Sequence, residues 1–114
     1  MTAIKFKKRF HPLIRDGIKT QTLRIPQKRL ELKKDDFAVC VFEDSPERVY
    51  VSITEVGYKY WQSLNEKDAE LEGFESVDEL KNFLLEIYPD VPSWGRLYYY
   101  RFVVEGVTER VKEK

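Results

Sequence analysis

The first quarter of the chain alternates apolar and polar residues in short runs that end at turn-forming residues. Residues 4–9 repeat with a period of two, which is typical of a strand with one apolar side. Residues 11–17 carry a proline near their start and end at Gly17, so they predict a short helix closed by a left-handed glycine. Residues 20–25 return to β-branched alternation and stop before Pro26, which predicts a second strand.

Strand-forming residues also dominate the middle and the end of the chain. Residues 37–43 and 49–56 are apolar and β-rich. The Asp-Ser-Pro-Glu sequence of residues 44–47 between them favours a turn, so the two runs predict an antiparallel hairpin. Residues 27–36 are polar and basic and predict a loop before this hairpin, and residues 97–105 predict a long strand rich in aromatic side chains.

Helical spacing occurs between these strands. Residues 64–71 and 77–88 carry Glu, Lys, Ala and Leu at helical intervals, and Gly73 separates the two predicted helices. Ser76 is followed three residues later by Glu79, which fits a capping box at the start of the second helix. One face of that helix is predicted to consist of Leu80, Phe83, Leu84 and Ile87.

Together these elements predict a single α+β domain over residues 1–114. We expect a small β-barrel of about five or six mostly antiparallel strands, with about two to three short helices against one opening. Residues 109–114 alternate in charge without an apolar run and are expected to fray. The length of 114 residues and the 42% of hydrophobic residues suit one compact core of modest size.

Composition argues against several classes of protein. The longest apolar run covers the six residues 37–42, far below the roughly 18 to 20 that a bilayer span needs. The N-terminus lacks the apolar core of a secretory signal, so we expect a cytoplasmic protein without a membrane partner or an obligate protein partner. Cys40 is the single cysteine and His11 the single histidine, which excludes a disulfide framework and a structural zinc site. We expect no cofactor, an inert Cys40 within an apolar strand, and a His11 that lies near a helix start.

Charge is balanced overall but divided along the chain. Residues 1–34 hold eleven Lys and Arg against two acidic residues, whereas residues 35–114 hold nine against eighteen. Clustered basic residues attract phosphate groups even in a neutral molecule, so RNA is a possible partner. Pairing between the two halves across the fold explains the same division without any ligand.

The segment from Gly17 to Arg24 gathers the side chains that are most suggestive of chemistry. On an ideal strand Lys19 and Thr22 would point to opposite faces. They converge only if Lys19 lies in the turn after Gly17 and the strand starts near Thr20. Thr20, Thr22 and Arg24 would then face a polar cleft while the apolar residues of the strand face the core. The alternative is an ordinary edge strand whose polar side chains are solvated.

The pattern Gly17-x-Lys19-x-x-Thr22-x-Arg24, which follows Arg9-Phe10 and a short helix, resembles the signature of the ASCH domain, a PUA-like β-barrel family linked to RNA. Many members carry Glu at the position of Thr22. A bacterial subfamily of very small ASCH proteins, the N4-acetylcytidine amidohydrolases, is similar in having Thr there. The likeness covers residues 9–105 and continues through Phe42-Glu43-Asp44, Leu64-x-Glu66-Lys67-x-Ala69-Glu70-x-Glu72, Glu79-Leu80-Lys81, Ile87-Tyr88-Pro89 and a closing Tyr-rich strand.

The resemblance implies a metal-independent hydrolysis with Lys19 as proton acceptor, Thr22 as nucleophile and Glu72 as proton donor. A threonine hydroxyl becomes a good nucleophile only when a base takes its proton. A lysine serves as that base only if its pKa falls from about 10.4 towards neutrality. The spacing of acidic residues does not by itself distinguish Glu72 from Glu70 or Glu75.

Substrate binding requires a slot for a flat base and polar groups at its edges. Aromatic side chains stack on bases for about 1 to 3 kcal/mol each. The residues expected to contact the substrate are Arg24, Arg9, Phe10, Glu43 and Tyr98. Trp94 and Tyr100 are further stacking candidates, and Trp94 is expected to be the most exposed of these aromatic residues.

Two functions therefore follow from the sequence. The first is an amidohydrolase that removes the acetyl group from N4-acetylcytidine or a related N-acylated cytosine, which makes a nucleoside the small-molecule partner. The second is a non-catalytic RNA-binding module, for which the basic segment with Lys28, Arg29, Lys33 and Lys34 is the motivation. The sequence leaves open whether the acylated cytosine is a free nucleoside or a position in RNA.

Overall fold

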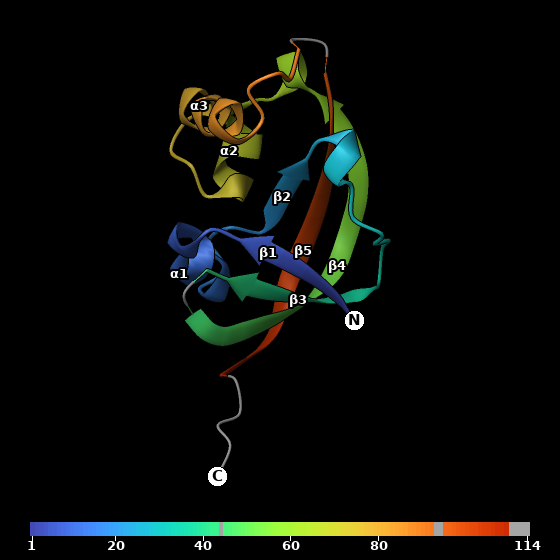
Figure 1. Ribbon diagram of the computed structural model, residues 1–114, viewed down its shortest axis with the longest axis vertical. Helices are drawn as coiled ribbons and strands as arrows, with labels where there is room; N and C mark the ends of the chain where they lie inside the picture. The colour runs from blue at the N-terminus through green and yellow to red at the C-terminus, as the bar shows by residue number, and fades with distance from the viewer. Residues whose placement is uncertain (44, 93–94, 110–114) are drawn as a thin grey trace.

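The chain folds around one five-stranded sheet, which is seen in a computed structural model that describes residues 1–43, 45–92 and 95–109 (Figure 1). The strand order is β1-β3-β4-β5-β2. β1 and β3 are parallel, whereas the other neighbours are antiparallel. The strands are β1 (Thr2–Phe6), β2 (Gln21–Arg24), β3 (Phe37–Phe42), β4 (Ser45–Tyr60) and β5 (Arg96–Glu109). With three α-helices beside this sheet, the predicted α+β class is confirmed.

The sheet curls into a half-barrel because its two longest strands are bent. Register shifts interrupt the β4–β5 ladder between Tyr50 and Val51 and between Ile53 and Glu55. Such irregularities bend a strand and increase its twist, and the curvature of β4 and β5 is visible in Figure 1. The half-barrel brings its two edge strands near each other, since Arg24 on β2 donates from Nη2 to the Lys5 carbonyl on β1 over 3.1 Å.

Three α-helices accompany the sheet. α1 (His11–Arg15) precedes β2, and α2 (Glu66–Glu72) and α3 (Val77–Ile87) connect β4 to β5. Gly17 after α1 has a φ of 76°, which confirms the predicted left-handed glycine. Figure 1 shows α2 and α3 together beside the β2 end of the sheet.

The helix caps match the sequence prediction only in part. The Ser76 side chain accepts from the Glu79 amide over 3.1 Å, as expected for the start of α3. The Glu79 carboxylate accepts from the Glu75 amide and not from the Ser76 amide, so the second hydrogen bond of the predicted capping box is not formed. The complete capping box stands at the start of α2, where Asn65 and Asp68 each accept from the other's backbone amide over 3.1 Å.

Two boundaries of the predicted strands were wrong. β1 ends at Phe6, and Lys8–Phe10 form a 3-10 helix instead of continuing the strand. The predicted antiparallel hairpin of β3 and β4 is confirmed, but its turn is shorter than residues 44–47, because β4 already begins at Ser45, which pairs with Phe42. Residue 44 itself lies outside the described residues. β4 runs on to Tyr60 because β5 pairs with it from Glu47 to Tyr60.

The core fills the inner side of the half-barrel and the space under the helices. The predicted face of α3 is confirmed, since Leu80 and Leu84 are fully buried and Phe83 and Ile87 pack against the core. Cys40 is buried on β3, and burial raises the pKa of its thiol to about 12. A thiol with such a pKa is inert at neutral pH, as predicted.

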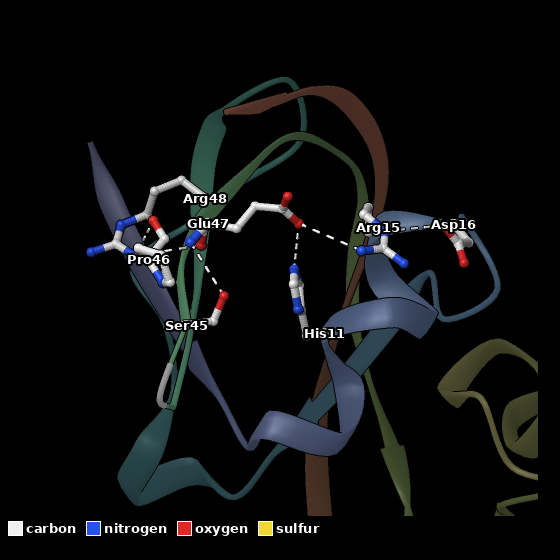
Figure 2. Close-up of polar contacts among 7 residues, drawn as sticks. All are labelled: His11, Arg15, Asp16, Ser45, Pro46, Glu47 and Arg48. Atoms are coloured by element: carbon white, nitrogen blue, oxygen red, sulfur yellow. Dashed lines mark hydrogen bonds and ion pairs between the residues drawn. The ribbon is translucent and has the colours of Figure 1, made fainter. Parts of the chain in front are cut away.

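His11 connects α1 to the start of β4. It is the first residue of α1, and its ring centroid lies 4.7 Å from that of Phe42. Figure 2 shows its Nε2 directed at the Glu47 carboxylate, which also faces Arg15 at 4.0 Å. The contacts of His11 therefore connect α1 to β3 and β4 of the sheet. Within the described ranges, no cluster of three His, Cys, Asp or Glu side chains is arranged around a metal site. No described helix is long and apolar enough to cross a membrane.

Candidate functional site

The turn after α1 places Lys19 and Thr22 on the same hollow. Lys19 lies before β2, and its amide donates to the Leu13 carbonyl over 3.0 Å. The next residue, Thr20, donates to the Leu71 carbonyl over 2.8 Å, which fixes the turn against α2. Thr22 is the second residue of β2. Because Lys19 precedes the regular strand, its side chain is free of strand alternation and reaches the face that Thr22 occupies.

Glu72 enters the same hollow from the end of α2. Lys19 Nζ donates to Glu72 Oε1 over 2.9 Å and to the Glu72 carbonyl over 3.0 Å. Lys19, Thr22 and Glu72 are only 3%, 4% and 3% exposed. Glu72 Oε2 is also buried, and it has no hydrogen-bond partner among the described residues. Three polar side chains from two distant segments therefore meet in one enclosed place.

The hollow is a cavity of about 140 Å³ between the two sheet edges and α3. β1 and the residues after it form one wall, β2 forms the opposite wall, and α3 covers the top. The lining residues are Lys5, Phe6, Lys7, Phe10, Lys19, Thr22, Leu23, Arg24, Glu72, Phe83, Leu84, Ile87 and Tyr88. A reacting group in this cavity would contact a polar triad on one side and aromatic and aliphatic side chains on the other.

Burial shifts both members of the Lys19–Glu72 pair towards their uncharged forms. Loss of solvent lowers the pKa of Lys19, and the nearby charges of Arg24 and Arg9 lower it further, against the opposing effect of Glu72. Loss of solvent likewise raises the pKa of Glu72, against the attraction of Lys19. A neutral amine can accept a proton and a neutral carboxyl group can donate one. Perturbed pairs of this kind are common at catalytic sites.

The structure brings Arg24 and Phe10 to the cavity and places Arg9 beside it. Arg24 Nε lies 3.4 Å from Thr22 Oγ1, within reach of a weak hydrogen bond. The Phe10 ring lies under the Lys19 side chain, whose Nζ is 4.7 Å from the ring centroid. Arg9 covers the outside of this aromatic wall, with its guanidinium 5.2 Å from the Phe10 centroid. Its contribution to the site is therefore its charge.

Other predicted substrate contacts lie away from this cavity. Glu43 is exposed beyond β3 and accepts from the Lys8 amide over 3.2 Å. Tyr98 contacts Arg29 and Tyr58 on another part of the surface. Tyr100 is buried, and its hydroxyl donates to the Leu30 carbonyl over 3.0 Å, which fastens the 27–36 loop to the barrel. Trp94 lies outside the described residues.

Tyr88 is a lining residue that the chemistry of the sequence did not single out. It follows α3 directly, is half-buried, and borders both the cavity and the next hollow along the surface. The signal was present in the Ile87-Tyr88-Pro89 segment of the ASCH-like pattern. Lys5 and Lys7 also line the cavity. The sequence did not mark them, because lysines at the end of a strand are usually exposed to solvent.

Gly73 packs closely against Lys19 and leaves no room for a side chain of its own, which gives a prediction for the stability of two glycine variants. Gly73 has a φ of 87°, and an added methyl group would meet Leu13 Cδ1 at 3.2 Å and Lys19 Cβ at 3.3 Å. Gly17 has a similar φ of 76° but open space around it. Gly17→Ala should therefore cost about 1 kcal/mol of unfolding free energy through its backbone alone. Gly73→Ala should cost clearly more in urea denaturation. Equal losses would mean that Gly73 does not position Lys19.

The protein is a small α+β half-barrel with a polar cavity between its edge strands. Solved structures share this fold. The sequence matches no protein-family model and no curated protein. An ASCH domain from Lactobacillus crispatus JV V101 superposes with a TM-score of 0.66 at 19% identity, over 82% of this chain and 68% of that chain.

Two further structures are similar. Protein EF3133 from Enterococcus faecalis V583, of the family-model DUF984, has a TM-score of 0.70 at 17% identity, over 94% of this chain and 76% of that one. The hypothetical protein PH0355 has a TM-score of 0.67 at 17% identity, over 90% of this chain and 96% of that one. The chain thus has the ASCH-like, PUA-like fold that its sequence predicted, and at these identities the likeness concerns the fold alone.

Proposed function

We propose that the protein is an amidohydrolase that removes the acetyl group from N4-acetylcytidine or a related N-acylated cytosine nucleoside. The observation that carries the proposal is the buried Lys19–Glu72 pair, which lines the same cavity as the Thr22 hydroxyl. The choice of substrate rests on the Gly17-to-Arg24 pattern, in which Thr22 is typical of the acetylcytidine amidohydrolases.

Acylation uses the neutral form of the pair. The Lys19 amine takes the hydroxyl proton while Thr22 Oγ1 attacks the acetyl carbonyl carbon. The C–N bond then breaks, and the Glu72 carboxyl group gives its proton to the departing cytosine amine. The step leaves an acetyl ester on Thr22, an ammonium on Lys19 and a carboxylate on Glu72. Because one positive and one negative charge form together, the net charge of the buried cavity does not change, which limits the cost of desolvation.

Deacylation reverses the two proton transfers. The Glu72 carboxylate takes a proton from water as the water oxygen attacks the ester carbon. The Thr22 oxygen leaves and receives a proton from the Lys19 ammonium. Acetic acid departs, and the pair returns to its neutral form with Thr22 free. Every atom and proton is thereby accounted for with no co-reactant other than water.

Arg24 supports the nucleophile in both steps. Its Nε lies 3.4 Å from Thr22 Oγ1, and its Nη2 is anchored on the Lys5 carbonyl. A fixed guanidinium at this position would stabilise the negative charge that develops on the threonine oxygen and the adjoining carbonyl. Its charge also helps to keep Lys19 deprotonated by lowering the pKa of the amine.

The direct test is turnover by the purified protein. Incubation with N4-acetylcytidine should release cytidine and acetate in equal amounts. Chromatography would measure the cytidine, and an acetate assay would measure the acetate. The N4-acylated base and the deoxynucleoside would define how much of the sugar is required. Absence of turnover on all of these substrates would overturn the proposal.

The pH dependence of kcat/KM should be bell-shaped. As the pH falls, the pair takes up a proton and the Lys19 ammonium can no longer act as a base. As the pH rises, the pair loses a proton and the Glu72 carboxylate can no longer act as an acid. Since burial lowers the pKa of Lys19 and raises that of Glu72, the acidic limb should lie below the ordinary pKa of a lysine and the basic limb above the ordinary pKa of a glutamate. Circular dichroism over the same range would control for unfolding, and a flat profile would contradict this assignment.

A non-catalytic RNA-binding module is the second candidate. It is supported by the exposed basic side chains of the segment between β2 and β3, namely Lys28, Arg29, Lys33 and Lys34. RNA affinity carried by these residues should fall steeply with salt concentration and should not respond to Thr22→Val. Affinity that is insensitive to reversal of their charge would exclude this function.

A further inference from the structure

The reactive cavity is too small to hold a whole nucleoside. Its volume is about 140 Å³, whereas pockets for small organic ligands usually measure about 300 to 1,000 Å³. A substrate whose acyl group reaches Thr22 must therefore extend out of it. A larger hollow of about 520 Å³ adjoins the cavity and shares Ile87 and Tyr88 with it. The two together have the volume that a nucleoside and an additional group require.

The walls of this second hollow are mostly apolar, and basic groups stand at its rim. Ile25 and the 3-10 helix Pro26–Lys28 form one side, and the segment after α3 forms the other. The charged lining residues are Lys28, Asp90 and Arg96. All three are exposed, so the hollow is lined by two cationic side chains and one carboxylate.

The basic groups around this hollow are held by aromatic rings and not by carboxylates. The Arg96 guanidinium lies 4.6 Å from the Tyr58 centroid and donates from Nη1 to the Tyr98 hydroxyl over 3.4 Å. Arg29, next to Lys28, lies 5.2 Å from the Tyr98 centroid. Across the described part of the chain, neither arginine comes within 4.0 Å of a carboxylate oxygen, nor does Lys28. Their charges are therefore available to an anion.

We infer that this second hollow binds a phosphate group on the ribose of the acylated cytidine, so that the substrate is a nucleotide rather than a free nucleoside. The inference deepens the proposed function and rests on it. The acylated base enters the cavity, Tyr88 borders the passage, and the sugar directs its phosphate to Lys28 and Arg96. A free mononucleotide and an RNA strand present the same chemistry to these two side chains.

The kinetic test compares N4-acetylcytidine with its 5′- and 3′-monophosphates and with a trinucleotide that carries the acetylated base in the middle. At least one phosphate-bearing substrate should show a kcat/KM about fivefold higher, through a lower KM, at low salt. Lys28→Glu and Arg96→Gln should remove this preference by lowering kcat/KM for the phosphate-bearing substrates towards the value for the nucleoside. A preference for the trinucleotide alone assigns the phosphate to RNA, whereas a preference for a monophosphate assigns it to a free nucleotide. Equal kcat/KM for all four substrates would overturn the inference.

A binding experiment separates this inference from the proposed reaction. Wild-type protein is titrated calorimetrically with cytidine and with its two monophosphates, which carry no acyl group and cannot turn over. Tighter binding of a monophosphate that depends on Lys28 and Arg96 supports the phosphate site, even if no acylated substrate is hydrolysed. Hydrolysis of N4-acetylcytidine with no effect of phosphate in either experiment overturns the site and leaves the reaction standing. Lys34→Glu is the matched control, since Lys34 is exposed and lines neither hollow.

Discussion

Thr22→Val should lower kcat for hydrolysis of N4-acetylcytidine by about 10³-fold or more and leave the fold intact. The substitution removes the hydroxyl that would carry the acyl group and retains the β-branched shape of the side chain. Loss of a nucleophile commonly costs three or more orders of magnitude, because the bound substrate then has no covalent route. Thr22 is 4% exposed, and among the described residues its hydroxyl has only the 3.4 Å contact with Arg24, so little stability depends on it. Steady-state kinetics and thermal unfolding would measure the two effects.

Two matched variants make this result specific. Thr20→Val makes the same chemical change two residues earlier, at a side chain that does not line the cavity, and should retain wild-type kcat. Thr22→Ser keeps a hydroxyl and should retain measurable turnover, with trapping of an acyl-enzyme as further support. Full activity in Thr22→Val would exclude a threonine nucleophile, whereas equal losses in Thr20→Val would indicate a general effect on β2.

Lys19→Met should destabilise the protein by about 3 to 5 kcal/mol and abolish activity. The change leaves Glu72 buried without the donor that lies 2.9 Å away, and removing one partner of a buried pair is strongly destabilising. The double variant Lys19→Met with Glu72→Gln should recover much of this stability, because no buried acidic group without its partner then remains. Urea denaturation of the two single variants and the double variant would form a double-mutant cycle.

The exposed pair Lys67–Glu70 provides the control for that cycle. Its atoms lie 3.5 Å apart, and its side chains are 66% and 74% exposed. The same substitutions there should change stability by less than about 1 kcal/mol and leave activity unchanged. Recovered stability without recovered activity in the Lys19 and Glu72 double variant is the expected pattern. Recovered activity would show that the pair serves only the fold.

Local patterns in the sequence determined most of the elements. Alternating, apolar and aromatic runs placed the five strands, and helical spacing placed α3 with its buried face. The short segment after Gly17 also showed how Lys19 and Thr22 could converge, namely if Lys19 lies in a turn, where a side chain escapes strand alternation. These features depend on neighbours within a few residues, and such neighbours are visible in any single sequence.

Tertiary structure decided which carboxylate belongs to the site. The sequence offers three equal candidates for the proton donor, namely Glu70, Glu72 and Glu75. Of these, Glu72 is buried, whereas Glu70 and Glu75 are exposed. A step of two residues on a helix turns a side chain to another face, so Glu70 points away from the sheet that Glu72 approaches. Which face meets the sheet depends on how α2 packs against β2.

The remaining features also arise from contacts between distant residues. Glu72 and Lys19 are separated by 53 positions, and the hollow beside Tyr88 forms where α3 and β2 end and β5 begins. β4 extends to Tyr60 because β5, about forty residues later, pairs with it. The sequence by itself thus determined the kind of most elements, and it left the convergence of Lys19 with Thr22 conditional on a turn at Lys19. Only the packing of the half-barrel against its helices decided the burial of the Lys19–Glu72 pair, and burial is the physical cause of their shifted pKa values.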